Sequence, residues 1–189
     1  TDHWGLDGGI MVTASHNPQD YNGLKLVREG ARPISEDSGL GAIQERANAI
    51  EAPEAVAREP AFASIRPAYY ERLLSFIDTG HLRPLRVLSD PGNGGAGSVM
   101  EALAAELPLE LVRLHHEPDG TFPNGIPNPL LPENRDAAAR AVVENAADLG
   151  IAWDGDFDRC FLFDEHGAFV EGYYLVGLLG QSFLRPQAG

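Results

Sequence analysis

The alternation of short apolar runs with helical segments over residues 85–153 constrains the fold of this chain more than any other feature. An apolar run at Leu85–Leu88 precedes a glycine-rich turn and a helical segment over Ser98–Leu107. Further apolar runs follow at Leu109–Leu114 and Leu149–Trp153, with a second helical segment between them. This order of strand, helix, strand, helix, strand predicts an α/β layer with parallel strands, in which ligands gather at the carboxyl ends of the strands.

Segments on either side of this layer carry weaker signals. Ile10–Val12 predicts a short buried strand, Leu24–Val27 a second strand, and Phe161–Phe163 a strand late in the chain. A proline-rich, acidic stretch over 51–60 is predicted to be a connection. The predicted helices occupy Ser38–Ile50, Ala68–Ile77, Glu133–Ala147 and Tyr173–Leu184. Together these elements predict an α/β fold with mixed, largely parallel sheets and helices on both faces.

Composition narrows the class of protein. With 189 residues, 43% of them hydrophobic, the chain can bury a core in one or two domains. The net charge of −14 argues against a sequence-independent nucleic-acid binder, which needs a basic surface. Apolar runs stay shorter than the roughly 18 residues of a membrane span. The single cysteine, Cys160, allows no internal disulfide and is expected to be a buried small apolar residue.

An acidic motif follows the apolar run at Leu149–Trp153. Asp154, Asp156 and Asp158 alternate with other residues, so their carboxylates can converge in a tight loop. Mg²⁺ prefers such oxygen ligands, and a cation would offset the repulsion among the carboxylates. A solvated acidic turn is the alternative. An EF-hand is excluded because Arg159 stands where that loop needs glycine, and because the flanks resemble strands.

A second motif, Thr13-Ala14-Ser15-His16-Asn17-Pro18, follows the first predicted strand. Ser15 can be read as a turn or cap residue, or as a hydroxyl that carries a phosphate. His16 is adjacent in sequence and is expected to point away from the Ser15 hydroxyl. Lys25 could be an acid or charge partner of that phosphate, or an exposed strand residue. Arg159 could grip a phosphate or order the aspartates through a salt bridge.

The glycine-rich turn over Asp90–Gly97 could bind a phosphate at the N-terminus of the helix that follows it. It lacks both the Gly-Lys-Ser/Thr of a P-loop and full Gly-x-Gly-x-x-Gly spacing. We therefore expect a strand-to-helix turn with structural glycines. His115 and His116 have no cysteine or third histidine beside them, so a metal site there is not expected.

Several motifs in the same order resemble those of the α-D-phosphohexomutases, closest to the bacterial phosphomannomutase/phosphoglucomutase branch. They cover nearly the whole chain and comprise Gly9-Ile10-Met11-Val12-Thr13-Ala14-Ser15-His16-Asn17-Pro18, Asp20-Tyr21-Asn22-Gly23-Leu24-Lys25, Asp90-Pro91-Gly92-Asn93-Gly94, Phe122-Pro123-Asn124-Gly125 and Asp154-Gly155-Asp156-Phe157-Asp158-Arg159.

The resemblance implies a set of roles. Ser15 would be the phosphorylated nucleophile, and Arg159 would contact its phosphate. His16 and Lys25 would lie at the active site, with Lys25 the better candidate for general acid/base work. Mg²⁺ would be held by a phosphate oxygen on Ser15 and by the aspartates Asp154, Asp156 and Asp158. The implied reaction interconverts mannose 6-phosphate and mannose 1-phosphate, and glucose phosphates as well, through a hexose 1,6-bisphosphate; glucose or mannose 1,6-bisphosphate would act as activator.

Members of the family have four domains around a cleft, and the resemblance implies that this chain contains parts of three of them. Residues 1–65 would be the later part of domain 1, 66–170 domain 2, and 171–189 the start of domain 3. The chain alone is therefore expected to be a weak mutase or inactive. The expected partner is a hexose phosphate, without nucleic acid or membrane, in the cytoplasm; the oligomeric state is not readable. A mutase for glucose or glucosamine phosphate and a non-catalytic Mg²⁺-binding fragment remain as alternatives.

Overall fold

The computed structural model describes residues 1–51 and 59–184. They form two compact units: residues 1–14 with 20–65 make up the first, and residues 15–19 with the chain from 66 onward make up the second. The short segment 15–19 therefore packs with the second unit, although in sequence it lies inside the first. Most of the connection predicted over 51–60 lies outside the described residues.

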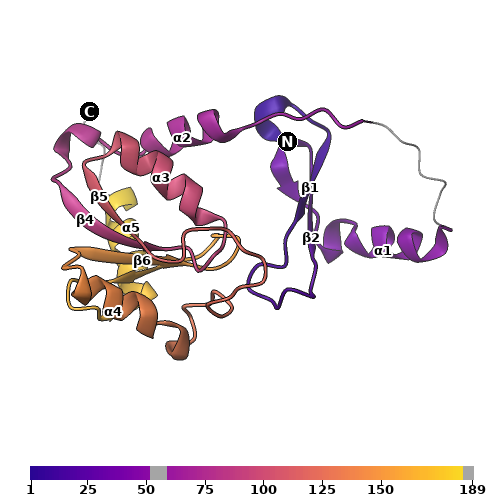
Figure 1. The fold of residues 1–189 in the computed structure, drawn as a ribbon. Coiled ribbons are helices and arrows are strands. Elements are labelled where there is room, and N and C mark those ends of the chain that lie inside the picture. Colours follow the sequence, from indigo (N-terminus) through magenta and orange to yellow (C-terminus); the bar gives the residue numbers. More distant parts are fainter. Residues whose placement is uncertain (52–58, 185–189) are drawn as a thin grey trace. The chain divides into compact units, whose positions relative to one another are not determined.

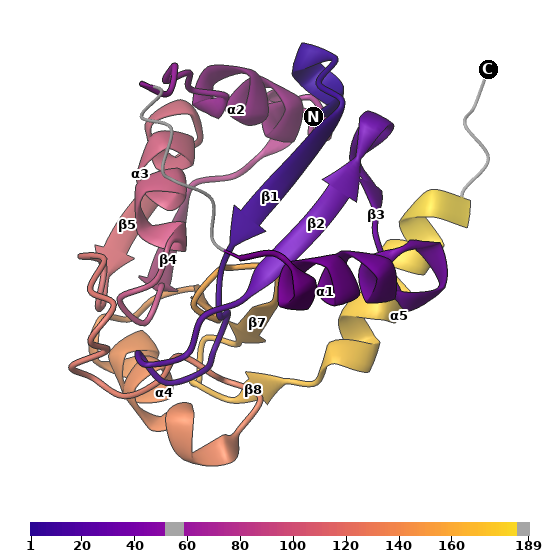
Figure 2. The same ribbon diagram turned by 90° about the vertical axis from the view of Figure 1, so that its right-hand side faces the viewer.

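The first unit is built around a small antiparallel sheet with strand order β1-β2-β3 (Figure 2). In the β1–β2 pair Gly8 lies opposite Arg28 and Val12 opposite Leu24. The elements are η1 (Asp2–Trp4), β1 (Gly8–Val12), β2 (Leu24–Arg28), η2 (Glu29–Ala31), β3 (Arg32–Pro33), η3 (Glu36–Ser38) and α1 (Leu40–Ala49).

The prediction that the first strand is buried is wrong. Ile10 in β1 is 65% exposed, and Met11 and Val12 are exposed to a similar degree. Successive strand residues point to opposite faces. Neither face of this part of β1 is therefore covered by the described residues. The apolar sequence correctly predicted a strand, whereas its burial depends on neighbouring layers that a local pattern does not reveal.

The second unit contains a five-stranded sheet with order β5-β4-β6-β7-β8. The central strand β4 runs parallel to β5 and β6, whereas β7 and β8 add antiparallel pairs at one edge. The predicted α/β class with mixed sheets is thereby confirmed. The elements are α2 (Arg66–Leu74), η4 (Thr79–His81), β4 (Leu85–Asp90), α3 (Ala96–Glu106), β5 (Leu109–Arg113), η5 (Pro132–Asn134), α4 (Asp136–Glu144), β6 (Leu149–Trp153), β7 (Cys160–Phe163), β8 (Phe169–Val170) and α5 (Gly172–Leu184).

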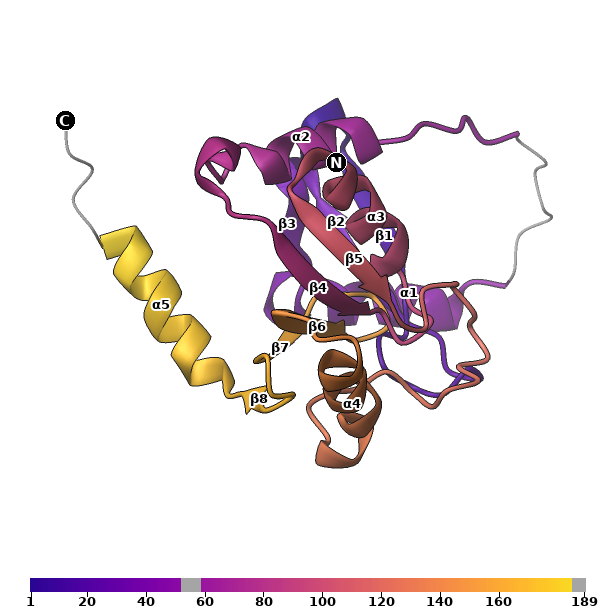
Figure 3. The ribbon, with the colours of Figure 1, turned by 60° about the vertical axis from the view of Figure 1, so that its left-hand side comes forward.

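Helices α3 and α4 lie on opposite faces of this sheet (Figures 1 and 3). The chain passes from β4 through α3 to β5 on one side, and then through α4 to β6 on the other side of β4. The strand order thus reverses between β4 and β6. In doubly wound sheets the carboxyl ends of strands at such a reversal are where ligands bind.

The core of the second unit lies between the sheet and α4. Leu88 on β4, Val142 on α4 and Phe163 on β7 are fully buried. Ala138, Ala147 and Ala152 complete the cluster, and Val112 and Phe169 pack against it. The core therefore ties the sheet centre to one helix, directly below the carboxyl ends of β4 and β6.

Helix α4 is shorter than the predicted Glu133–Ala147. At its start, Pro132–Asn134 forms a separate 3-10 turn. At its end, the backbone amide and the side-chain amide of Asn145 both donate to the carbonyl of Ala141, and Ala146 adopts a positive φ of 47°. A left-handed residue after the last turn is a common way to end a helix, and it overrides the helical propensity of the alanines.

Two apolar features of the second unit are exposed. Cys160 is exposed, so the expectation that it is buried is wrong; it opens β7 directly after the acidic loop, where the strand is not yet covered. Helix α5 follows β8 (Figure 3) and exposes apolar side chains that include Tyr173, Val176 and Leu179. Of the helices in the described part of the chain, none combines the length and apolarity that crossing a membrane requires.

Replacing Val142 by Ala is expected to lower the free energy of unfolding by about 2–3 kcal/mol, since two buried methyl groups are lost and a cavity remains. Val143→Ala is the matched control, because the next residue on the same helix is 56% exposed. Its effect should stay within about 0.5 kcal/mol. Chemical denaturation of both variants measures the difference, and equal effects would contradict the assigned core.

Candidate active site

The acidic motif forms a tight loop at the carboxyl end of β6. The backbone amide of Phe157 donates to the carbonyl of Asp154 at 3.0 Å, and the Asp154 amide donates to the carbonyl of Arg159 at 3.3 Å. Phe157 has a positive φ of 49°, which reverses the chain. Within this turn one carboxylate oxygen each from Asp154, Asp156 and Asp158 lies within 4.8 Å of the others.

The Ser15 hydroxyl lies against this loop, within the second unit. Its Oγ is 3.0 Å from Asp154 Oδ2 and 3.1 Å from Asp156 Oδ1. Two motifs separated by 139 residues are thus brought into hydrogen-bonding contact. A serine hydroxyl carries one hydrogen, so it can satisfy only one of these carboxylate oxygens at a time. The arrangement therefore has a surplus of negative acceptors around a single hydroxyl.

Arg159 balances part of this negative charge. Its Nε and Nη2 donate to Asp154 Oδ2 at 2.9 and 2.6 Å, and its backbone amide donates to Asp154 Oδ1 at 3.1 Å. The Asp154 side chain is fully buried, so its carboxylate depends on such partners. The same Nη2 lies 3.4 Å from Ser15 Oγ. Arg159 therefore both orders the aspartate and reaches the hydroxyl.

His16 lies beside the Ser15 hydroxyl, and the expectation that it points elsewhere is wrong. Its Nδ1 is 3.2 Å from Ser15 Oγ and also contacts Arg159 Nη2. A guanidinium can only donate, so Nδ1 is the acceptor in that contact. The physical reason is the backbone of Ser15, whose positive φ of 55° turns the chain so that neighbouring side chains share one side.

Lys25 belongs to the first unit. It lies in β2, opposite Met11 of β1 in the register of the antiparallel pair. Its predicted part in acid/base chemistry remains a prediction.

The donor set of the acidic loop fits a magnesium ion. Mg²⁺ takes oxygen ligands, commonly from one or two carboxylates together with phosphate and water. Here three carboxylates converge, one of them buried, and a hydroxyl that could carry a phosphate lies within 3.1 Å of two of them. Among the residues that the structure describes, this is the only group of acidic, histidine or cysteine side chains arranged in this way.

The glycine-rich turn after β4 lies directly beside the acidic loop. Gly95 donates its backbone N–H to the carbonyl of Gly155 at 3.0 Å. Asp90 accepts from the Gly92 amide and from His115 Nδ1, both at 3.0 Å. Burial raises the pKa of the Asp90 carboxyl above its ordinary value, and the neighbouring His115 opposes that shift. The segment is a turn from strand β4 to helix α3, as the sequence predicts.

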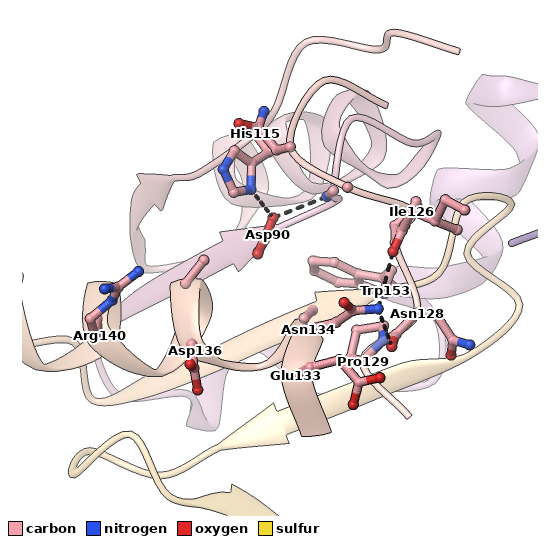
Figure 4. Close-up of a pocket in the computed structure, with 16 residues that line it drawn as sticks. Asp90, His115, Ile126, Asn128, Pro129, Glu133, Asn134, Asp136, Arg140 and Trp153 are labelled. Carbon is pink, nitrogen blue, oxygen red and sulfur yellow. Dashed lines mark hydrogen bonds and ion pairs between the residues drawn. The ribbon is translucent and has the colours of Figure 1, made fainter. Parts of the chain in front are cut away.

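A cavity of about 220 Å³ lies beside this turn (Figure 4). Asp90, His115 and Trp153 line it, together with Glu133, Asp136 and Arg140. Its three carboxylates outnumber its single guanidinium.

Sequence reasoning missed two features of this region. One is the contact of His16 with the hydroxyl, which no local signal could reveal because it depends on the φ angle of Ser15. The other is the support of the acidic loop by the glycine-rich turn. The sequence shows the glycines of both loops, but their positions along the chain do not indicate that the two loops are in contact.

Comparison with known proteins identifies the family of this chain. Residues 67–167 match the family described as phosphoglucomutase/phosphomannomutase, alpha/beta/alpha domain II, and residues 1–54 match its alpha/beta/alpha domain I. Over its whole length the chain is 61% identical to a protein named "Phosphohexose mutases" from Xanthomonas campestris pv. campestris, covering 42% of it. It is 56% identical to a phosphomannomutase from Salmonella typhimurium, again over its whole length, covering 43% of that protein.

A solved structure of a phosphoglucomutase/phosphomannomutase family protein from Burkholderia thailandensis has the same fold, with a TM-score of 0.79 and 33% identity. The alignment covers 97% of this chain and 39% of that one. The chain thus spans less than half the length of the relatives it matches. Two family domains matched in order, with high identity throughout, leave one conclusion: this chain belongs to the phosphoglucomutase/phosphomannomutase family.

Proposed function

We propose that the protein containing this chain is a phosphohexomutase that acts on mannose phosphates and glucose phosphates through a phosphoserine at Ser15. The observation that carries the proposal is the position of Ser15 Oγ, 3.0 and 3.1 Å from the carboxylates of Asp154 and Asp156. A hydroxyl held beside a metal-type carboxylate cluster and a guanidinium has the parts that phosphoryl transfer needs. The names of the relatives support the choice of sugar phosphates.

In the proposed reaction a hydroxyl oxygen of the hexose phosphate bonds to the phosphorus on Ser15 while the bond between phosphorus and Ser15 Oγ breaks. The hexose hydroxyl would lose its proton to the neutral amine of Lys25, and a proton from water would restore the Ser15 hydroxyl. The hexose 1,6-bisphosphate then reorients in the site and transfers its other phosphate to Ser15. The same bisphosphate, from glucose or mannose, would load the serine at the outset and so act as activator.

Asp154, Asp156 and Asp158 would hold Mg²⁺ together with a phosphate oxygen on Ser15. When bound, the ion would neutralise negative charge on the transferring phosphoryl group. Arg159 would hold the phosphate oxygens, because its Nη2 already lies 3.4 Å from Ser15 Oγ. His16 would orient the hydroxyl through Nδ1, 3.2 Å away. Beside the covalent phosphoserine, positioning and charge would supply much of the rate.

The proposal extends to the division of the chain and to its activity. Residues 1–65 would be part of domain 1, 66–170 domain 2, and 171–189 the start of domain 3. Since the relatives are more than twice as long, this chain by itself would be inactive or weak. Its partner would be a hexose phosphate.

Incubation of the complete protein with Mg²⁺ and glucose 1,6-bisphosphate is expected to place a phosphate on Ser15, because its hydroxyl lies beside Arg159 and the carboxylates. Peptide mass spectrometry across residues 10–25 measures it. A phosphate found only on other residues would contradict the assignment of the nucleophile.

Ser15→Ala in the complete protein is expected to lower mutase turnover by at least about 1000-fold, because no other hydroxyl would carry the phosphate. Ser75→Ala is the matched control, since the exposed Ser75 hydroxyl only donates to the carbonyl of Arg72 and should leave turnover unchanged. A coupled assay of hexose phosphate interconversion gives both rates. Near-normal turnover of Ser15→Ala would refute the role of Ser15.

Asp156→Asn is expected to weaken Mg²⁺ binding at least about tenfold, because one carboxylate charge is removed from the cluster. Asp37→Asn, at an exposed position in η3, provides the control with the same change of charge. Isothermal titration calorimetry measures both. An unchanged affinity in Asp156→Asn would place the metal elsewhere.

A further inference from the structure

We infer that the glycine-rich turn Asp90–Gly95 positions the acidic loop and, through it, the backbone of Ser15; the inference rests on the proposed function of that site. Gly94 and Gly155 are the positioning residues. Neither touches the reacting atoms. They act by letting three backbone segments stack closely enough that the serine hydroxyl and the carboxylates keep their spacing.

The first contact of the stack joins Gly94 to Gly155. A Cβ atom added to Gly94 would lie 2.6 Å from the Gly155 carbonyl oxygen and 2.9 Å from its Cα. Side-chain carbons do not approach backbone atoms this closely, so any residue but glycine at 94 would displace the acidic loop. The neighbouring hydrogen bond from the Gly95 amide to the Gly155 carbonyl, at 3.0 Å, holds the loop in this position.

The second contact joins Gly155 to Ser15. A Cβ atom on Gly155 would overlap the Ser15 carbonyl oxygen, and it would lie 3.4 Å from the Ser15 carbonyl carbon. Gly155 stands between Asp154 and Asp156, the two residues whose carboxylates reach the Ser15 hydroxyl. The order of the stack is therefore turn, acidic loop, serine loop. A displacement at Gly94 is passed to the spacing between hydroxyl and carboxylates.

The turn is itself held firmly enough to act as a support. The buried side chain of Asn93 donates to the Glu117 carbonyl and accepts from Asn124, both at 2.8 Å. Asp90, also buried, accepts from the Gly92 amide and from His115, as the dashed lines in Figure 4 show. Because these bonds hold the turn in place, we expect added bulk at residue 94 to move the acidic loop rather than the turn.

A support of this kind predicts an effect that depends on the metal. Mg²⁺ demands near-ideal octahedral geometry, whereas Ca²⁺ accepts a flexible shell with more ligands. A displaced acidic loop should therefore lose Mg²⁺ affinity more than Ca²⁺ affinity. General destabilisation of the fold would lower both affinities alike, because both ions would bind the same carboxylates.

The test compares Gly94→Ala with Gly120→Ala in the complete protein. Gly120 has no atom within 4 Å of an added Cβ and no positive φ, so it is a matched glycine control. Calorimetric titration with each ion alone should show a loss of Mg²⁺ affinity of about tenfold or more in Gly94→Ala and a loss of Ca²⁺ affinity below about threefold. Hydrogen exchange should become faster in the peptide covering 154–159. Gly120→Ala should change neither quantity.

Two results in a folded Gly94→Ala protein would overturn the inference. One is that Mg²⁺ affinity and hydrogen exchange over 154–159 are both unchanged. The other is that the affinities for both ions fall equally while exchange in this peptide is unchanged. If Gly94→Ala does not fold, Asn93→Gly serves instead. Glycine tolerates the positive φ of 63° at this position, so the substitution removes only the side-chain hydrogen bonds of the turn. We expect the same larger loss of Mg²⁺ than of Ca²⁺ affinity and the same faster exchange over 154–159. Should the wild-type protein bind no Mg²⁺, the proposed function fails, and exchange over 154–159 still decides the positioning role.

Discussion

The hydrogen-bonding contact between the Ser15 hydroxyl and the carboxylates of Asp154 and Asp156 is the interaction on which the rest of this site depends. It joins the segment 15–19 to the second unit, although the neighbouring residues on both sides belong to the first. At this contact the backbone of Ser15 lies so close to the backbone of Gly155 that position 155 has no space for a side chain. Backbone packing, rather than side-chain reach, therefore sets the spacing of the proposed nucleophile and the proposed metal ligands.

Charge is the second constraint on the site. Asp154 is fully buried, and an isolated buried carboxylate would be costly. Arg159 offsets that cost with two side-chain hydrogen bonds and one from its backbone. Removing the guanidinium, whose side chain is 34% exposed, would leave the buried Asp154 charge uncompensated. The guanidinium is thus part of the fold of the acidic loop, and it already stands where a phosphate on Ser15 would need a cation.

The sheet topology explains why both loops meet. The strand order reverses between β4 and β6, so the turn after β4 and the acidic loop after β6 emerge side by side. Helix α3 follows the turn after β4, and helix α4, which leads into β6, lies on the opposite face of the sheet. At this edge the three carboxylates of the acidic loop converge beside the Ser15 hydroxyl and the Arg159 guanidinium.

The sequence alone was sufficient for the α/β class, for most elements of the second unit and for the family, because hydrophobic periodicity and the short motifs at strand ends are local properties. It also singled out the serine, arginine and aspartates, since their chemistry is characteristic. Tertiary structure decided what depends on neighbours: the exposure of β1 and of Cys160, the end of α4, and the turn of His16 toward the hydroxyl. It alone showed that Gly94, Gly155 and Ser15 stack, because a close approach of backbones leaves no trace in the spacing of residues along the chain.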